Sequence, residues 1–576
     1  MSSLPVPRWK SRATVAALAA GAGAVVWWQR GRRHRRPRDD RSEPREPSAE
    51  SPAPPESFDH YNPQPQHAPG TTGGHHVDNP VLLDVATGTS SDKAILVMVG
   101  LPARGKTFLA RKIQRYLSFF HALRCEIFNV GDYRRGRIGN FQPAAFFDNS
   151  NADALRLRQE CTQAACDDLR AYMTQGNDGR IAILDGTHTT RAKRAFLLRE
   201  LESIGAKLIW VESICEDESV IDRNIRACKL GTPDYEGMEA NAAVEDFRTR
   251  VAHYSDIYEQ INQFDDESAL AYIKVFECRK FVINNIRGYL PGRIVQFLTS
   301  LHMQGHEFYL SRHGQSEYNR LKKIGGDSGL SEQGDRYARR LAEFTERRIC
   351  VDERTGASRP GRLWTSTLRR TKETAQYIQH PTIEIAYEGD DVNGRKQQWI
   401  QMRQRAWNNL DELFAGLCDG MTYEEIEERH PEEFMRRKAD KLAYRYPRGE
   451  SYLDMIHRLE PMVHEMERHR EPLLIVAHQG ILRLIYAFYM GLPREEAPYV
   501  SIPLNTVIKL VPGTYDCAEQ RHVLLKLTKS VRNDGQNEPQ SPDEPPAKPT
   551  PPKAGQSARR SARGSRDHDD NDPPSH

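Results

Sequence analysis

The sequence predicts two α/β domains with parallel sheets, one after the other, between two disordered tails. Three observations predict this class. Short apolar runs, such as residues 94–99 and 472–477, end directly in glycine- or histidine-bearing motifs, as strands buried on both faces of a parallel sheet do. Helical periodicity follows the first of these motifs. Both ends of the chain are polar and proline-rich, with no apolar periodicity.

Composition limits the classes of function. The chain has 576 residues, of which 28% are charged and 38% hydrophobic, which is typical of soluble domains with polar appendages. Residues 1–38 hold nine of the 82 Lys and Arg and no acidic residue, so the rest of the chain carries 73 bases against 79 acids. This argues against a nucleic-acid partner, which normally needs a basic folded domain. The nine cysteines include no C-x-x-C pair, which excludes a disulfide scaffold or zinc ribbon and suits a reducing, cytoplasmic location.

The N-terminal region has two parts, a basic and apolar segment over residues 1–38 and a linker over residues 39–92 that we expect to be disordered. Residues 13–28 are uncharged and flanked by arginines. As a helix they would span about 24 Å, short of the roughly 30 Å hydrocarbon core of a bilayer. Three interpretations stay open: a marginal membrane anchor, a cleaved targeting peptide and an unstructured basic arm. Residues 531–576 form a second disordered tail.

The first motif with chemical meaning is a complete G-x-x-x-x-G-K-T over residues 100–107, between a strand and a helix. Gly100 and Gly105 allow backbone N–H groups to turn inward around phosphate oxygens. Lys106 is expected to reach the β- and γ-phosphates, and Thr107 to coordinate Mg²⁺. The motif therefore predicts a nucleotide phosphate site.

Further strands end in polar residues at the edge where open α/β sheets bind ligands. The run at residues 180–184 ends in Asp185, whose carboxylate suits a place near the metal or the attacking hydroxyl; the alternative is an N-cap of the next helix. The run at residues 126–130 leads into Arg134 and Arg135, which either clamp an anionic substrate or decorate the surface.

Five stretches together resemble the kinase half of the bifunctional 6-phosphofructo-2-kinase/fructose-2,6-bisphosphatase family. They are GLPARGKT, FNVGDYRRG, LDGTHTTR, VESIC and CKLGTPDY. The resemblance implies a P-loop NTPase-type domain over residues 93–300, ATP at Lys106, and Mg²⁺ at Thr107 and Asp185. It implies a catalytic role for Lys106 and Asp185, and His188 stands where the family usually has Asn. The remaining residues that it implies are Asn224 on the nucleotide side and, for fructose 6-phosphate, Arg134, Arg135, Arg158, Thr187, Arg191, Lys229 and Tyr235.

The second constellation is a pair of histidines that follow two strands. One strand ends in an R-H-G triplet that contains His313, and the run at residues 472–477 ends in His478. We expect both side chains to converge above one sheet edge, with Arg370 and Glu412 coming from the sequence between them. Phosphoryl transfer through a covalent intermediate needs a neutral imidazole, cations that offset the phosphate charge and an acid for the leaving alkoxide.

Six further stretches resemble the histidine phosphatase superfamily, and specifically the bisphosphatase half of the same bifunctional family. They are RHGQSEYN, IGGDSGLSEQG, TSTLRRT, AGLCDGMTYEEI, YRYPRGESY and AHQGILR. The resemblance implies a histidine-phosphatase-type α/β domain over residues 305–530. It implies His313 as the nucleophile and Glu412 as the acid and base. Around the phosphoryl group it implies His478, Arg312 and Arg370, with Asn319 nearby, and around the rest of fructose 2,6-bisphosphate it implies Tyr423, Arg437, Lys441, Arg445, Tyr452, Gln479 and Arg483.

The predicted function is a bifunctional enzyme that makes fructose 2,6-bisphosphate from fructose 6-phosphate and ATP and hydrolyses it through a phosphohistidine, controlling glycolytic flux. The resemblance also implies a homodimer. Phe414 stands where family members commonly carry an acid, and residues 388–405 read as an insertion, so we expect an attenuated phosphatase. Two alternatives stay open. Either only one activity is effective, because of Phe414 or His188, or the chain is a membrane-tethered pseudoenzyme scaffold, which the intact catalytic residues disfavour.

Overall fold

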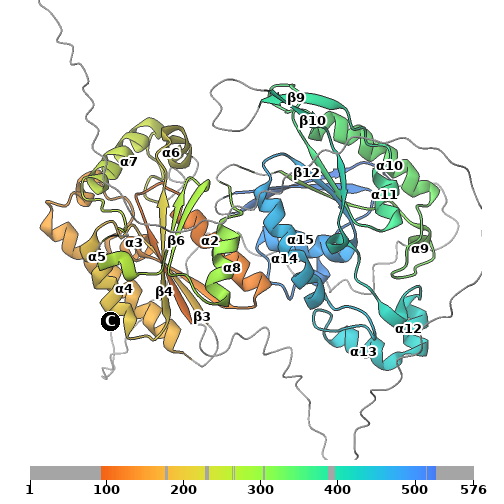
Figure 1. Cartoon of the computed structure of the whole chain (residues 1–576), viewed down its shortest axis with the longest axis horizontal. Helices are drawn as coiled ribbons and strands as arrows, with labels where there is room; N and C mark the ends of the chain where they lie inside the picture. The colour runs from red at the N-terminus through yellow and green to blue at the C-terminus, as the bar shows by residue number, and fades with distance from the viewer. Residues whose placement is uncertain are drawn as a thin grey trace, which may run out of the picture. The chain divides into compact units, whose positions relative to one another are not determined.

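The computed structural model describes residues 93–526, apart from residues 176–179, 227–232, 263, 265, 303–304, 306, 387–395 and 514–515. The described residues form two α/β domains, each built around a six-stranded and mostly parallel sheet (Figure 1). The predicted fold class is therefore confirmed. The N-terminal segment, the linker and the C-terminal tail of the sequence analysis lie outside the described residues.

The first domain has the strand order β2-β3-β1-β4-β5-β6, in which only the edge strand β6 is antiparallel to its neighbour. The strands are β1 (Ala94–Val99), β2 (Arg124–Asn129), β3 (Arg180–Asp185), β4 (Lys207–Ile214), β5 (Tyr272–Phe276) and β6 (Lys280–Asn284). The helices are α2 (Lys106–Phe120), α3 (Val130–Ile138), α4 (Ala152–Thr174), α5 (Arg191–Glu202), α6 (Glu218–Asn224), α7 (Ala240–Ser255) and α8 (Tyr289–Leu298). Helices α2 and α8 cover one face of the sheet, and α3, α4 and α5 cover the other (Figure 1).

Strand β1 is buried along its whole length because helices pack on both of its faces. Leu96 and Met98 belong to the core under α2, together with Leu109. Val97 points to the other face and belongs to the core that includes Leu169 of α4. This explains why the run is continuously apolar rather than alternating, and it places the carboxyl end of β1 in the middle of the sheet edge.

The second domain has the strand order β11-β8-β12-β7-β13-β14, in which the first four strands are parallel. The strands are β7 (Phe308–Arg312), β8 (Arg362–Thr365), β11 (Gln404–Ala406), β12 (Leu473–Ala477), β13 (Thr506–Pro512) and β14 (Cys517–Val523). The helices are α9 (Glu317–Arg320), α10 (Glu332–Phe344), α11 (Arg369–Ala375), α12 (Tyr423–Arg429), α13 (Pro431–Ala439), α14 (Tyr452–Arg468) and α15 (Gln479–Met490). Helices α14 and α15 pack on one face of the sheet, and α10 and α11 on the other.

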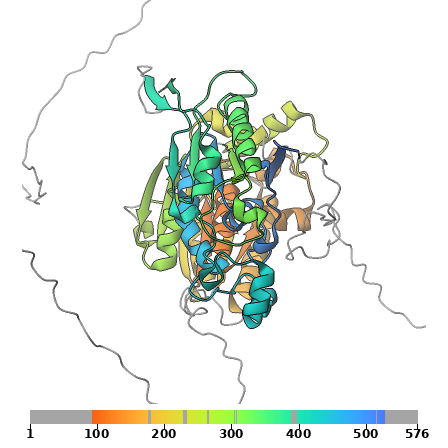
Figure 2. The same cartoon turned by 90° about the vertical axis from the view of Figure 1, so that its right-hand side faces the viewer.

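A short hairpin of β9 (Thr382–Ala386) and β10 (Lys396–Ile400) forms a separate two-stranded sheet. It projects from the rest of the second domain in both views (Figures 1 and 2). The stretch that reads as an insertion in the sequence, residues 388–405, contains β10 and leads into β11. The guanidinium of Arg362 lies over the ring of Trp399, 4.6 Å from its centroid, and this contact ties the hairpin to β8.

Helix α2 of the first domain packs against α14 and α15 of the second, within one continuous apolar core. Buried polar contacts cross this interface. The Lys112 ammonium lies 2.7 and 3.0 Å from the two carboxylate oxygens of Glu467. The Tyr116 hydroxyl donates a hydrogen bond to Glu460 at 2.5 Å. In the described part of the chain, no helix combines the length and the hydropathy that crossing a bilayer requires.

The Lys112–Glu467 pair allows a test of this interface, because the two side chains are 6% and 0% exposed. Lys112→Met leaves a buried carboxylate without its cation, and we expect it to lower the free energy of unfolding by about 3–5 kcal/mol. The double variant Lys112→Met/Glu467→Leu should recover most of that loss, because neither charge of this pair then remains buried without its partner. Urea unfolding measures both.

The matched control is the Arg340–Glu343 pair, whose side chains are 59% and 49% exposed. The same pair of substitutions there should change the free energy of unfolding by less than about 1 kcal/mol. A Lys112→Met protein as stable as the parent would contradict the buried pair.

Candidate active sites

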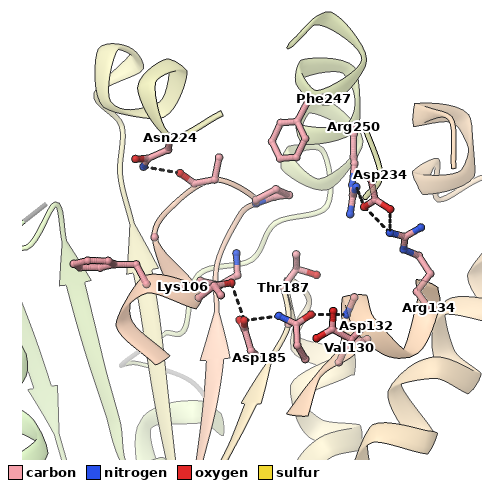
Figure 3. Close-up of a pocket in the computed structure, with 18 of the residues that line it drawn as sticks. Lys106, Val130, Asp132, Arg134, Asp185, Thr187, Asn224, Asp234, Phe247 and Arg250 are labelled. Carbon is pink, nitrogen blue, oxygen red and sulfur yellow. Dashed lines mark hydrogen bonds and ion pairs between the residues drawn. The ribbon is translucent and has the colours of Figure 1, made fainter. Parts of the chain in front are cut away.

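The first site begins with the register of two parallel strands. Asn129 at the end of β2 pairs with Asp185 at the end of β3. The Asn129 amide donates to Asp185 Oδ2 at 2.7 Å, and the Thr107 hydroxyl donates to the same oxygen at 2.7 Å. Figure 3 shows Asp185 at the centre of these contacts. The sheet edge and the first turn of α2 therefore hold one buried carboxylate beside the predicted phosphate loop.

Gly100 shows why the loop begins with glycine. Its φ of 130° is unfavourable for other residues, and a Cβ there would lie 2.4 Å from the Ser213 carbonyl oxygen of β4. The Gly100 N–H donates to the Thr187 carbonyl at 2.9 Å. The start of the loop is therefore fixed between the strand ends of β3 and β4.

Two side chains brace the rest of the loop. The Lys106 ammonium donates to the Leu101 carbonyl at 2.6 Å, so it lies across the loop that it follows. The Asn224 amide, at the end of α6, donates to the Ala103 carbonyl at 3.1 Å. Asn224 thus lies at the loop, on the side that the resemblance assigns to the nucleotide (Figure 3).

The loop opens on a cavity of about 650 Å³. Most of the residues predicted for this site line it: Gly105, Lys106, Thr107, Arg134, Arg135, Arg158, Asp185, Thr187, Asn224 and Tyr235. Arg191 is not among the lining residues, and its guanidinium lies 3.4 Å from Asp266. Lys229 lies outside the described residues.

Asp234 organises the arginines of this cavity, and sequence reasoning did not identify it. Arg134 Nη2 lies 2.6 Å from both Asp234 oxygens, and the guanidiniums of Arg135 and Arg250 lie 3.4 and 3.7 Å away (Figure 3). Burial alone would raise the pKa of Asp234, but the hydrogen bond from Arg134 and the arginine charges hold it below its usual value. Three guanidiniums on one carboxylate leave a positive wall, which suits a phosphorylated substrate.

His188, where the family usually has Asn, lies beneath the turn that follows β3. It is buried and has a φ of 42°. A Cβ added to Gly186 would lie 2.5 Å from its Nε2, so the imidazole packs directly on that glycine. Burial, with the charges of Lys193 and Lys106, lowers the pKa of His188 to about 3, so the ring is neutral.

The second site depends on strand register as well. Ala477 of β12 pairs with Arg312 of β7, so the next residues, His478 and His313, leave the sheet side by side. The backbone N–H of His313 donates to the Ala477 carbonyl at 3.0 Å, which continues the ladder as far as His313. The two imidazole centroids lie 5.1 Å apart. The predicted convergence of the two histidines is therefore present.

Arg370 lies between the two rings. Its Nε is 3.2 Å from His313 Nε2 and 3.2 Å from His478 Nδ1, and a guanidinium only donates. The partners of the other ring nitrogens fix the tautomers: His313 Nδ1 donates to the Gly314 carbonyl at 2.8 Å, and His478 Nε2 donates to the Ser366 hydroxyl at 2.6 Å. His313 Nε2 therefore carries a lone pair, as a nucleophile must.

Burial is the largest cause of the low pKa values of both histidines. It lowers the pKa of His313 and of His478 well below 6.5, and the Arg370 charge lowers both further. Burial also lowers the pKa of Arg312 to about 10, and its Nε is buried without a hydrogen-bond partner among the described residues. Neutral imidazoles and closely spaced guanidiniums form a site that suits a phosphate anion.

Glu412 approaches this site at the start of α15. Its Oε1 accepts hydrogen bonds from the Gly480 N–H at 3.1 Å and the Leu413 N–H at 2.9 Å. A Cβ at Gly480 would lie 2.5 Å from that oxygen, so only glycine allows the approach. Arg458 of α14 donates to the carbonyl of Glu412 at 3.2 Å and thereby holds the loop. Glu450 pairs with Arg458 at 2.9 Å, and sequence reasoning identified neither residue.

The remaining predicted residues of the second domain carry polar contacts on neighbouring elements. Arg483 donates to the Tyr452 hydroxyl at 3.3 Å, and Arg437 donates to the Tyr423 hydroxyl at 2.9 Å. Lys441 is buried and lies over the Tyr499 ring, Arg445 pairs with Asp454, Asn319 Oδ1 accepts from the Ser316 N–H at 3.1 Å, and Gln479 is the first residue of α15. Burial raises the pKa of Tyr452, Arg483 opposes the rise and Glu412 adds to it, which puts all three within electrostatic reach.

Comparison with known proteins gives two family matches that together span both domains. The 6-phosphofructo-2-kinase family model matches residues 84–305, and the model of the histidine phosphatase superfamily (branch 1) matches residues 308–390 and 394–524. The 6-phosphofructo-2-kinase/fructose-2,6-bisphosphatase of Gallus gallus is 39% identical over 424 residues, which cover 73% of this chain and 83% of that protein.

The chain belongs to the 6-phosphofructo-2-kinase/fructose-2,6-bisphosphatase family. The 6-phosphofructo-2-kinase/fructose-2,6-bisphosphatase 3 of Rattus norvegicus is 38% identical over 429 residues, 74% of this chain and 71% of that protein. The family member from Arabidopsis thaliana is 41% identical over 449 residues, 77% of this chain and 55% of that protein. The first domain is thus the kinase half, and the second is the bisphosphatase half.

Phe414, the departure in the bisphosphatase half, is 53% exposed. Its backbone N–H donates to Glu450 Oε2 at 3.0 Å, and its carbonyl accepts from the Glu450 N–H at 2.9 Å. The backbone at this position is therefore fixed by Glu450 whatever the side chain. The expected attenuation of the phosphatase stays a prediction.

The packing of His188 on Gly186 in the kinase half gives a compensating pair of substitutions. Gly186→Ala forces a Cβ against the buried imidazole, and we expect it to lower the kinase rate by about ten- to a hundredfold through displacement of the turn. His188→Asn should keep most of the activity, because asparagine is smaller and tolerates a positive φ. The double variant should regain at least about tenfold over Gly186→Ala. Steady-state kinetics measures all three, and a double variant no better than Gly186→Ala refutes the contact.

The neutral histidines of the bisphosphatase half predict a loss of stability in acid. In the unfolded chain each takes up a proton near pH 6.5, whereas its native pKa is lower, so the unfolded state binds more protons below that pH. Stability therefore falls as the pH falls, by about 1 kcal/mol per histidine between pH 6.5 and 5.5.

His478→Gln should reduce that drop by about 1 kcal/mol, as urea unfolding at the two pH values measures. His457→Gln, at an exposed position, controls for the substitution itself. An equal drop in His478→Gln and the parent would show that His478 is not held neutral.

Proposed function

We propose that the chain catalyses both reactions of its family: ATP-dependent synthesis of fructose 2,6-bisphosphate from fructose 6-phosphate, and hydrolysis of its 2-phosphate. One observation carries the proposal, namely that both sites are intact in one chain. Thr107 and Asp185 meet at 2.7 Å at the phosphate loop, and Arg370 lies 3.2 Å from each of the two histidines. These opposed activities would set the level of a sugar bisphosphate that controls glycolytic flux.

In the kinase half, catalysis would rest on positioning and charge neutralisation. Lys106 would move from the Leu101 carbonyl to the β- and γ-phosphates of ATP. Arg134, with Arg135 and Arg158, would hold the phosphate of fructose 6-phosphate, while Asp234 keeps two of these guanidiniums in place. The 2-hydroxyl would then face the γ-phosphoryl group, near Asp185.

The oxygens at the phosphate loop fit Mg²⁺, a hard cation that prefers oxygen ligands. Thr107 Oγ1 and Asp185 Oδ2 are 2.7 Å apart, and the Asn129 amide orients the carboxylate. We propose Thr107 and Asp185 as the residues that hold it, directly or through water. When bound, Mg²⁺ would supply charge neutralisation of the transferred phosphoryl group.

In the bisphosphatase half, His313 Nε2 would attack the 2-phosphorus of fructose 2,6-bisphosphate. A bond from nitrogen to phosphorus forms, the bond from phosphorus to the sugar oxygen breaks, and Glu412 donates its proton to that oxygen. Water would then hydrolyse phospho-His313, with Glu412 as the base, to release phosphate. Arg312, Arg370 and His478 would stabilise the charge on the phosphoryl oxygens.

We also propose a cytoplasmic homodimer, which the family resemblance implies. The eight cysteines of the described residues are free, in keeping with a reducing compartment. Membrane contact through residues 13–28 concerns residues outside the described part of the chain. Size-exclusion chromatography with light scattering tests the dimer, and a fluorescent fusion to the full chain tests the location.

Single substitutions separate the two activities. Lys106→Ala should lower bisphosphate synthesis by at least about a hundredfold, because a charge on the transferred phosphoryl group loses its partner. It should leave hydrolysis within about twofold, because Lys106 has no part in that site. His313→Ala should do the reverse and abolish the acid-labile phosphoenzyme formed from bisphosphate labelled with ³²P at position 2.

Both rates are measured on the same preparation of the full chain. A Lys106→Ala protein that still makes the bisphosphate, or a His313→Ala protein that still forms the phosphoenzyme, would contradict the assignments. A parent protein with one measurable rate would support the single-activity alternative instead.

A further inference from the structure

A second cavity, of about 480 Å³, lies between the two domains, where the last turns of α2 meet the segment that follows α15. Arg111, Arg115 and Arg494 line it, and Glu495 is its one acidic lining residue in the described part of the chain. Arg111 also lines the kinase cavity, whereas Arg115 and Arg494 line only this one of the two. Neither catalytic mechanism uses these two side chains.

The acidic lining of this cavity is limited, among the described residues, to one exposed side chain. The Glu495 side chain is 66% exposed and lies 3.2 Å from Arg494, so solvent screens it. Glu467, a buried acid whose charge acts on Arg115, pairs with Lys112 at 2.7 Å. Arg115 and Arg494 thus share this cavity with one acidic lining residue of the described chain, and solvent screens that carboxylate.

Arg115 is held in place by the second domain. Its Nη1 donates to the Tyr489 carbonyl at 2.9 Å, near the end of α15. Its Nη2 would lie 3.6 Å from a Cβ at Gly491. Burial lowers the pKa of Arg115, Cys517 and Glu467 oppose this, and the charge of Arg111 lowers it further. A partly buried guanidinium with a positive neighbour is stabilised by an added anion.

The rest of the lining is largely apolar. Phe119, Ala122 and Leu123 come from α2 and the loop after it, and Leu492 and Pro493 come from the segment after α15. Such a floor suits a carbon skeleton rather than a bare ion. The volume is that of a small metabolite.

We propose that this cavity binds a small organic anion with two or more phosphate or carboxylate groups. Arg115 and Arg494 bind the anionic groups, and the carbon skeleton lies on Phe119 and Leu492. Because the ligand contacts both domains, it stabilises their packed arrangement and raises the unfolding temperature by mass action.

The test uses the full chain saturated with a non-hydrolysable ATP analogue, Mg²⁺ and fructose 6-phosphate, so that the kinase site is occupied. Binding that Arg494→Gln retains is assigned to the bisphosphatase site and subtracted. Tricarballylate and inorganic pyrophosphate are titrated separately by calorimetry, and the shift in unfolding temperature is recorded. We expect one binding site for at least one of the two probes. Binding of tricarballylate assigns a polycarboxylate, and binding of pyrophosphate alone assigns a phosphate compound.

Two neighbouring substitutions with opposite expected effects locate the site. Arg494→Gln should weaken binding at least tenfold and remove the temperature shift, because it deletes a cation. Glu495→Gln should strengthen binding severalfold, because it deletes the one acidic lining residue of the described cavity. Neither should change the two catalytic rates in the absence of the probe, which separates this proposal from the proposed function.

Three results overturn the proposal. They are no binding of either probe to the parent, equal binding to the parent and Arg494→Gln, and weaker binding to Glu495→Gln. Circular dichroism of each variant checks that it is folded. A loss of binding in a folded Arg494→Gln protein is then attributed to the cavity and not to misfolding.

Discussion

The register of parallel strands is the constraint on which both sites depend. In the first domain it aligns Asn129 with Asp185, and in the second it brings His313 beside His478. Backbone hydrogen bonds set these positions, so the side chains of both candidate sites are held by a buried sheet. A slip of one residue in either pairing would turn a side chain of the candidate site to the opposite face. The helices that cover both faces of each sheet bury apolar side chains in one register only.

Both sites are also arranged so that positive charge is left for the substrate to neutralise. In the bisphosphatase half, burial keeps the two histidines neutral, so the guanidinium of Arg370 lies beside uncharged rings, an arrangement that favours a phosphate anion. In the kinase half, Asp234 fixes its arginines while it neutralises only part of their charge. Low local dielectric makes such an arrangement costly in the free protein and favourable with phosphate bound. The free-energy cost of burying the arginines is therefore offset when a phosphorylated sugar binds, and this favours binding.

The sequence predicts those parts of the structure in which local pattern and function coincide. Strands β1 and β12 are continuous apolar runs because helices cover both faces, and their motifs follow directly. Strand β6 could not be predicted in this way, because its burial is partial and follows no clear period. Asp234 and Arg250 could not be predicted either. The ion pair of Asp234 with Arg134 spans 100 residues, and Arg250 lies on α7, where an arginine normally indicates only a solvated face.

The sequence also could not predict that the two sites share a pair of supporting helices, because the contacts between these helices join residues far apart in the chain. Helix α2 begins with Lys106 and Thr107 at the phosphate loop, and further along it Lys112 and Tyr116 bind carboxylates of α14. Helix α14 also carries Arg458, which holds the loop of Glu412. Each of these contacts joins residues far apart in the sequence, and none leaves a periodic signature. The phosphate loop and Glu412, the acid in the proposed hydrolysis, are therefore supported by two helices packed against each other, and we expect a change in that packing to displace both.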